Sequence, residues 1–157
     1  MSRVRETLFN WLRLEVPDAH VLDLFAGTGA LSFEALSRGA SFATLLDRDR
    51  VVTNQLRAES RKLGANCEVV TASAPLWLER QSVWPWDIVF LDPPFKSNLL
   101  ERVLPHLKER RVMVYIEQNR RDFVDDFPGW NTLKLGHAGE VLFRLLRPGL
   151  SNDGLQN

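Results

Sequence analysis

The sequence predicts an α/β fold in which helices cover both faces of a mostly parallel, seven-stranded sheet. Three observations support this prediction. Short apolar runs of strand length alternate with amphipathic segments over most of the chain. Glycine, serine or aspartate follows several of these runs, as expected where parallel strands end beside a ligand. The last two runs have only a glycine-rich turn between them, which predicts an antiparallel pair.

The first half of the chain predicts helices and strands in alternation. The first helix has apolar residues at helical spacing and is expected to end before Pro17. On the long third helix we expect Val51, Leu56 and Leu63 to face the core, and Gly64 to end the helix. The elements expected here are helix 3–15, strand 21–25, helix 30–38, strand 42–46, helix 48–63 and strand 67–71.

The second half of the chain continues this alternation and then changes to strands. Pro105 lies within a helical pattern and is expected to kink that helix or set its register. The final strands are expected to pair around the turn 136–139. The elements expected here are helix 74–80, loop 81–85, strand 87–91, helix 98–109, strand 112–117, a brief helix or turn at 122–127, and strands 130–135 and 140–146.

Length and composition predict one domain, 1–148, followed by a flexible tail, 149–157. Lys+Arg and Asp+Glu each number 20, and this zero net charge argues against coating nucleic acid by bulk charge while leaving room for a local basic face. Cys67 is the only cysteine and the histidines are scattered, so we expect neither a disulfide nor a metal site. No apolar run reaches the length of a membrane span and no signal peptide is visible, so a cytoplasmic location is expected.

The stretch 21–31 forms a strand, a tight turn of small residues and the start of a helix. Gly27 and Gly29 allow positive φ and let a ligand approach the main chain. A dinucleotide-binding turn would have a third glycine where Ser32 stands, and a P-loop would have a lysine nearby. The acid Asp23 lies at the strand end instead, which suits a ligand with a positively charged end.

Further polar residues follow the ends of other predicted strands. Asp47 lies about 20 residues after the glycines, the spacing at which an acid meets ribose hydroxyls in Rossmann-type folds. Ser73 and Asp92 follow the next two strands. Because parallel strands end at one edge of a sheet, we expect these residues and Gly27 to share one rim.

The strand before Asp92 runs directly into Asp92-Pro93-Pro94-Phe95, and with these motifs the chain resembles an S-adenosylmethionine-dependent methyltransferase that acts on an exocyclic amine. This resemblance implies the methyltransferase version of the Rossmann-like fold and no metal. Asp23 would accept hydrogen bonds from the ammonium of the donor and Asp47 from its ribose. The expected donor-binding residues are Asp23, Phe25, Ala26, Gly27, Gly29, Leu31, Asp47, Arg48, Ser73, Ala74 and Asp92.

The tetrad would hold the acceptor, and its four residues are our expected catalytic residues. An amino group on a base is a poor nucleophile, because its lone pair is delocalised into the ring. The Asp92 carboxylate and the Pro93 carbonyl could accept its two N–H bonds and direct the lone pair at the methyl group. Pro93 and Pro94 fix φ and remove competing N–H groups, and Phe95 offers a face for stacking a base.

The opening run 3–12, the glycine corner with the segment 34–40, and Val89-Phe90-Leu91 before the tetrad together resemble the RsmD family. This resemblance spans residues 3 to about 147. It implies transfer of a methyl group to the N2 of a guanine in 16S ribosomal RNA, free or within an assembling small ribosomal subunit. Nothing in the sequence demands more than a monomer, so a monomer is expected. The product of the donor would be S-adenosylhomocysteine.

Two departures from the family pattern bear on this expectation. The family usually carries a basic stretch before the position of Arg3, which is expected to help grip RNA, whereas here Met1-Ser2 leads directly into the expected first helix. It often has Asp or Asn where this chain has Ser73, whose hydroxyl has a shorter reach toward adenine. The alternatives are an amino-methyltransferase acting on DNA or another RNA, or a donor-binding module that needs a partner or has lost catalysis.

Overall fold

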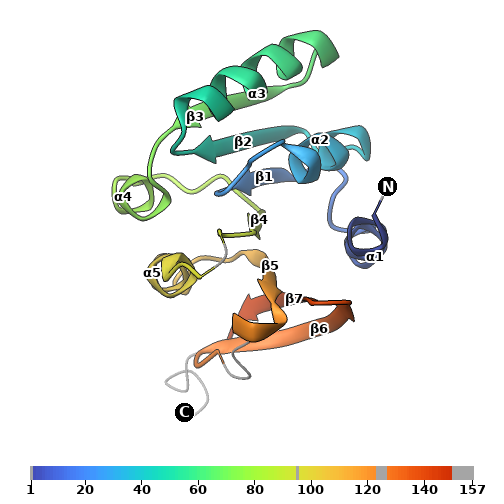
Figure 1. Ribbon diagram of the computed structural model, residues 1–157, viewed down its shortest axis with the longest axis vertical. Helices are drawn as coiled ribbons and strands as arrows, with labels where there is room; N and C mark the ends of the chain where they lie inside the picture. The colour runs from blue at the N-terminus through green and yellow to red at the C-terminus, as the bar shows by residue number, and fades with distance from the viewer. Residues whose placement is uncertain (1, 95, 123–126, 150–157) are drawn as a thin grey trace.

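The computed structural model describes residues 2–94, 96–122 and 127–149, and its centre is a single seven-stranded sheet (Figure 1). The strand order is β3-β2-β1-β4-β5-β7-β6, in which the first five are parallel and the last two antiparallel to their neighbours. The strands are β1 (His20–Asp23), β2 (Phe42–Asp47), β3 (Cys67–Thr71), β4 (Ile88–Leu91), β5 (Met113–Asn119), β6 (Trp130–Ala138) and β7 (Val141–Pro148). The predicted α/β class and the seven strands with an antiparallel C-terminal pair are confirmed.

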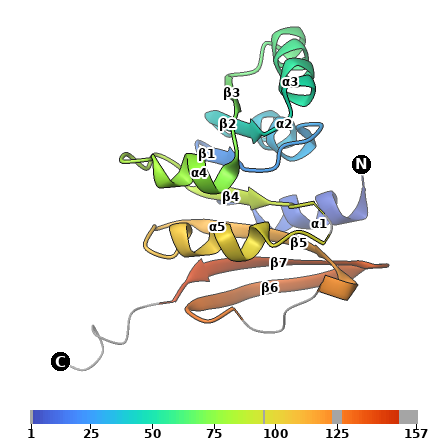
Figure 2. The same ribbon diagram turned by 60° about the vertical axis from the view of Figure 1, so that its left-hand side comes forward.

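Helices cover both faces of the sheet and enclose two apolar cores (Figure 2). On one face, side chains from α1, α2 and α3 pack on Val21, Leu45 and Phe90. On the other, side chains from α4 and α5 pack on Leu22 and Val89. The helices are α1 (Arg3–Trp11), α2 (Ala30–Ser37), α3 (Arg50–Leu63), α4 (Ala74–Glu79) and α5 (Leu99–Leu107), with a short 3₁₀ helix η1 at Arg120–Asp122. Strands buried on both faces explain the continuous apolar runs of the sequence.

The strand order reverses between β1 and β4, which lie side by side although they are far apart in the sequence. From β1 the chain runs outward through β2 to β3, and it then returns to β4 and β5 on the other side. Ligands of open α/β sheets bind outside the carboxyl ends of the strands at such a reversal. The fold therefore places the glycine corner after β1 and the tetrad after β4 at one position on the rim.

The C-terminal hairpin is longer than the sequence predicted. β6 runs on to Ala138 and β7 begins at Val141, so the turn is Gly139-Glu140, with Gly139 at φ 59°. β7 inserts between β5 and β6. The glycine at 136, which the prediction assigned to the turn, instead lies within β6, where a Cβ would meet the ring of Phe143 at 2.6 Å. It is glycine there because the ring occupies the space of a side chain.

Several predicted boundaries differ from the structure. The first helix ends at Trp11, and the first strand ends at Asp23 rather than at residue 25. Of the residues expected to face the core on α3, Leu56 is buried, whereas the predictions for Val51 and Leu63 were wrong, because their side chains are 65% and 55% exposed.

The two misplaced side chains have separate causes. Val51 lies five residues before Leu56, which is about 140° around the helix, so both cannot face the sheet. Leu63 is the last residue of α3, where Gly64 in left-handed conformation ends the helix. Polar contacts hold α3 to the edge strand instead: Thr53 Oγ1 lies 2.7 Å from Thr71 Oγ1.

Pro105 is accommodated within α5, and Leu100, Val103, Leu104 and Leu107 form the buried side of that helix. Most of the predicted helix or turn at 122–127 and most of the predicted tail at 149–157 lie outside the described residues. Among the residues that the structure describes, no helix has the length and apolar character needed to cross a membrane.

Candidate active site

Two cavities lie along the rim formed by the carboxyl ends of the parallel strands. The corner cavity is lined by the glycine corner and has a volume of about 400 Å³. The Glu117 cavity is lined by the ends of β4 and β5 and by α5, and has a volume of about 530 Å³. Asp92 and Pro94 line both cavities. Asp92 and Pro94 thus stand between two neighbouring spaces, each of which is open to a different group.

The structure brings most of the predicted donor-binding residues together in the corner cavity. They come from the ends of β1, β2, β3 and β4, as the strand-end argument required. The predicted residues that line it are Asp23, Phe25, Ala26, Gly27, Leu31, Asp47, Arg48, Ser73, Ala74 and Asp92. Arg102 and Leu99 of α5 also line it, and the sequence analysis did not identify them. Ser73 is the N-cap residue of α4, but its hydroxyl does not cap the helix and can serve the cavity.

Asp47 fastens the glycine turn to the end of β2. Its Oδ2 accepts the backbone N–H of Gly27 at 3.2 Å, and its Oδ1 accepts the N–H of Asp49 at 2.9 Å. Each carboxylate oxygen has a second lone pair, so both can still accept a ligand hydroxyl. Gly27 adopts φ 56°, and a Cβ placed on it would meet no described atom within 4 Å. The main chain is therefore open to a ligand at this point.

Gly29 does not line the corner cavity, although it was predicted to bind the donor. It is the N-cap residue of α2 with φ 80°, and a Cβ on it would lie 2.5 Å from the Phe33 ring and 2.9 Å from Leu56. This glycine permits the turn and the close packing of α2 on α3. Gly29 therefore faces packed side chains, whereas Gly27 lines the cavity.

Asp23 is the most deeply buried acid at the site, with 2% of its surface exposed. Its Oδ2 accepts the hydroxyl of Ser32 at 2.7 Å. Burial raises the pKa of Asp23 to about 6 against the lowering effect of this hydrogen bond, and the nearby charge of Asp47 raises it slightly. Ser32, where a dinucleotide-binding turn would have glycine, here supports the acid.

Asp92 faces both cavities, so its carboxylate is exposed to the cavity space while protein surrounds it on several sides. Burial raises the pKa of Asp92 to about 7, with further raising by the charges of Glu117 and Asp23. Burial also raises the pKa of Glu117, so Asp23, Asp92 and Glu117 are three neighbouring carboxylates with raised pKa values. A cation placed among them would relieve the repulsion.

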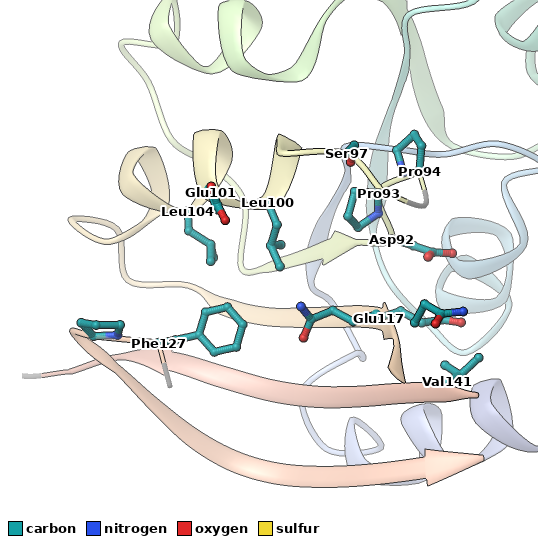
Figure 3. Close-up of a pocket in the computed structure, with 13 residues that line it drawn as sticks. Asp92, Pro93, Pro94, Ser97, Leu100, Glu101, Leu104, Glu117, Phe127 and Val141 are labelled. Carbon is teal, nitrogen blue, oxygen red and sulfur yellow. The ribbon is translucent and has the colours of Figure 1, made fainter. Parts of the chain in front are cut away.

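The Glu117 cavity has one apolar wall and one polar wall (Figure 3). Leu100 and Leu104 of α5 lie opposite the ring of Phe127, and together they can enclose a flat ring. The polar wall is formed by the end of β5, residues 117–119, and by Asp92. The guanidinium of Arg144 lies 4.6 Å from the centre of the Phe127 ring, which supports that ring from the other side of the wall.

Glu117 and Phe127 are cavity residues that the sequence analysis did not identify. For Glu117 a signal existed, because it ends the predicted strand 112–117 and the strand-end argument applies to it as it does to Asp92. For Phe127 no local signal existed, since it enters the cavity through the chain path between β5 and β6. Phe95, the predicted stacking residue of the tetrad, lies outside the described residues.

No cluster of three or more histidine, cysteine or acidic side chains suited to a metal ion occurs in the described ranges 2–94, 96–122 and 127–149.

Comparison with known proteins identifies relatives over nearly the whole chain. The model of a family described as conserved hypothetical protein 95 matches residues 1–147. Ribosomal RNA small subunit methyltransferase D of Escherichia coli K12 is 41% identical over 151 residues, which cover 92% of this chain and 76% of that protein. The protein of the same name from Haemophilus influenzae is 38% identical over 153 residues, with 92% and 79% coverage.

Solved structures agree with the sequence comparison. An Escherichia coli protein described as a methyltransferase, yhhF, superposes with a TM-score of 0.87 at 40% identity, covering 96% of this chain and 89% of that one. The ribosomal protein L11 methylase of Lactobacillus delbrueckii subsp. bulgaricus shares the fold alone, with a TM-score of 0.75 at 14% identity and coverage of 96% and 81%. The predicted methyltransferase version of the Rossmann-like fold is confirmed.

Proposed function

This chain belongs to the RsmD family, and we propose that it transfers a methyl group from S-adenosylmethionine to the exocyclic N2 of a guanine in small-subunit (16S) ribosomal RNA. One observation carries the proposal: Asp92 and Pro94 line both cavities of the rim. A group in the corner cavity and a base in the Glu117 cavity would meet at the tetrad. Methyl transfer requires this arrangement of two reactants.

The corner cavity fits S-adenosylmethionine in shape and charge. The open main chain at Gly27 leaves room for the methionine part, and Asp47 is held so that both of its oxygens can accept ribose hydroxyls. Burial and neighbouring carboxylates raise the pKa values of Asp23 and Asp92, and the ammonium and sulfonium of the donor would stabilise the ionised forms. We propose that the reaction needs no metal.

The donor, when bound, supplies a methyl group on positively charged sulfur, which leaves as a neutral thioether. The residues of the chain then have to orient the acceptor. The Asp92 carboxylate and the Pro93 carbonyl accept hydrogen bonds from the two N–H groups of the amine, which directs the nitrogen lone pair toward the methyl group. A new N–C bond forms as the S–C bond breaks, and the nitrogen loses a proton. Asp92, whose pKa is about 7, can take that proton near neutral pH.

The partner that follows from this reaction is 16S ribosomal RNA, free or within an assembling small ribosomal subunit. Arg48 and Arg102 line the corner cavity and Arg120 and Arg121 follow the end of β5, so basic side chains border the rim despite the zero net charge. Such residues can contact phosphates near the target base. We propose a monomer acting in the cytoplasm, where ribosomal RNA is modified.

The test is transfer of labelled methyl groups to small ribosomal subunits, and to their free RNA, from cells that lack guanine-N2 methylation. Digestion to nucleosides identifies the labelled base, and fragment mapping locates it. We expect N2-methylguanosine with the unaltered chain and at least a hundredfold slower labelling with Asp92→Ala. Glu109→Ala, an exposed acid outside both cavities, is the matched control.

Two results would count against the proposal. Label on a base other than guanine would make the chain a different amino-methyltransferase. No label on either substrate, with donor binding intact by calorimetry, would mean that the chain binds the donor but does not suffice as a catalyst.

A further inference from the structure

We propose that Glu117 selects guanine by accepting a hydrogen bond from the ring N1–H beside the amine that Asp92 holds. This inference rests on the proposed function and adds the side chain that sets its base specificity. Glu117 lines the same cavity as Asp92, Pro93 and Pro94 (Figure 3). It plays no part in the mechanism given above, although it is a half-buried acid facing that space.

The register of the sheet puts Glu117 next to Asp92. β4 and β5 are parallel, and their pairing matches Phe90 with Tyr115 and Leu91 with Ile116. The next residue on each strand path is Asp92 on one and Glu117 on the other. Neighbouring strands lie about 4.8 Å apart. The two carboxylates can therefore contact adjacent groups on the edge of one base.

The hydroxyl of Tyr115 fixes the orientation of the Glu117 carboxylate. It donates to Oε2 at 3.1 Å, and the described part of the chain makes no other hydrogen bond to this carboxylate. Tyr115 is fully buried, and its ring packs edge-on against Phe90 at 6.3 Å. Because the buried Tyr115 hydroxyl is bonded to Oε2, the other oxygen of the Glu117 carboxylate, Oε1, remains available to the cavity. Burial raises the pKa of Glu117 above its usual range, while the Tyr115 hydroxyl and the charge of Arg5 on α1 act in the opposite direction and favour the ionised form.

The chemistry of the bases explains why a second carboxylate would choose guanine. Adenine, cytosine and guanine all carry an exocyclic amine. In adenine and cytosine the ring nitrogen beside that amine on the pairing edge has a lone pair, whereas in guanine it carries a hydrogen. An ionised acceptor at Glu117 would meet a donor in guanine and a repelling lone pair in the other two. A site built to accept a particular N–H discriminates strongly against bases that lack it.

The experiment uses 2-aminopurine, which has the same exocyclic amine as guanine but a lone pair at N1. Small-subunit RNA is ligated with guanine or 2-aminopurine at the mapped nucleotide, and initial rates of methyl transfer are measured with the full chain. The unaltered chain should methylate guanine about 10 to 100 times faster, the effect of one hydrogen bond to a charged group. The 2-aminopurine base also lacks O6, so the decisive quantity is the change of this ratio on mutation.

Glu117→Gln should reverse the preference. The Tyr115 hydroxyl would continue to donate to the side-chain oxygen, which turns the amide NH₂ toward the cavity. That NH₂ suits the N1 lone pair of 2-aminopurine and opposes the N1–H of guanine. The ratio should fall below one, which is a change of at least tenfold, and Tyr115→Phe, which keeps the acid but removes its orienting hydroxyl, should lower it by a smaller factor. Glu109→Gln, the same charge change at an exposed acid outside both cavities, should leave the ratio unaltered.

Binding of S-adenosylhomocysteine, measured by calorimetry, shows whether each variant is folded with an intact corner cavity. An unchanged ratio in Glu117→Gln would overturn the inference. So would an equal loss on both substrates, because Glu117 would then act on any acceptor alike. If the unaltered chain methylates neither substrate, the proposed function itself fails, which is a different result.

Discussion

The two cavities of the rim are built in different ways. The corner cavity is made largely of short motifs, in which a strand, a turn and a helix start follow one another within a few residues. The Glu117 cavity collects side chains from β5, α5, β7 and the segment before β6. Each part of the first is therefore recognisable in a short stretch of sequence, whereas the second is complete only once the C-terminal hairpin has paired with β5. We expect donor binding and acceptor selection to respond to different mutations.

The largest expected effect tests the corner cavity at Asp47. Asp47→Ala removes the acceptor of the Gly27 and Asp49 N–H groups, and in our proposal that of the ribose hydroxyls. Affinity for S-adenosylhomocysteine, measured by calorimetry, should fall about a hundredfold, since hydrogen bonds to charged groups contribute about 1.5–3 kcal/mol each.

The control for Asp47 is its neighbour. Asp49→Ala removes only the helix cap formed by the Asp49 carboxylate and the Val51 N–H at 2.8 Å. It should destabilise the fold by about 1 kcal/mol without changing donor affinity. Equal affinity losses in the two variants would mean that Asp47 acts through the fold alone.

The corner cavity was largely predictable from the sequence, because each of its parts is a short motif. A glycine that needs positive φ, or an acid that follows an apolar run, can be recognised from a few neighbouring residues. Gly27, Asp47, Ser73 and Asp92 were all placed correctly on one rim. The exception is Gly29, whose neighbours Phe33 and Leu56 come from packing between two helices. A sequence pattern does not separate a glycine that faces a ligand from one that faces a side chain.

In the Glu117 cavity the sequence analysis identified only tetrad residues, although the strand-end pattern could also have identified Glu117. The part of its wall that Phe127 and Val141 form depends on the chain path between β5 and β6 and on where β7 enters the sheet, and both are set by pairing across the chain. The errors on α3 have another origin, because Val51 and Leu63 were assigned to the core from their apolar character alone, without regard to the helical period or to the end of the helix.

The next prediction compares how much alanine at each of the two corner glycines, Gly27 and Gly29, lowers the free energy of unfolding. Gly29→Ala should destabilise the protein by about 2–4 kcal/mol, because it adds strain at positive φ and overpacks against Phe33 and Leu56. Gly27→Ala meets no described atom within 4 Å, so its destabilisation should be about 1–2 kcal/mol. Urea unfolding gives both values.

Ligand affinity should rank the same two variants in the opposite order. A methyl group on Gly27 enters the corner cavity, whereas one on Gly29 does not. Gly27→Ala should therefore weaken binding of S-adenosylhomocysteine more than Gly29→Ala does, at a temperature where both are folded. The opposite order would place Gly29 against the donor, as the sequence suggested.

A smaller effect tests the apolar wall of the Glu117 cavity. Phe127→Leu keeps an apolar side chain but removes the flat face and the cation–π contact with Arg144. The KM for ribosomal RNA should rise about five- to tenfold, since stacking of a base on an aromatic ring contributes about 1–3 kcal/mol. Donor affinity should not change. A loss of donor affinity would show that the two cavities are coupled.

The smallest expected effect concerns charge at the boundary of the two cavities. The pKa of Asp92 is raised to about 7 and that of Asp23 to about 6, so both lose their charge as the pH falls through these values. A sulfonium near them should favour the ionised forms. The affinity of S-adenosylmethionine relative to neutral-sulfur S-adenosylhomocysteine should therefore be higher at pH 8 than at pH 5.5, by about fivefold for a partly exposed charge pair.

Asp92→Asn keeps the shape of the side chain and removes its charge, so it should flatten this pH dependence of the affinity ratio. Both ligands carry the ammonium that Asp23 would bind, and the contribution of Asp23 should largely cancel in the ratio. Titration calorimetry at the two pH values measures all four affinities for each protein. If the unaltered chain and Asp92→Asn give the same slope, the Asp92 carboxylate does not sense the sulfonium, and its role would lie with the acceptor amine alone.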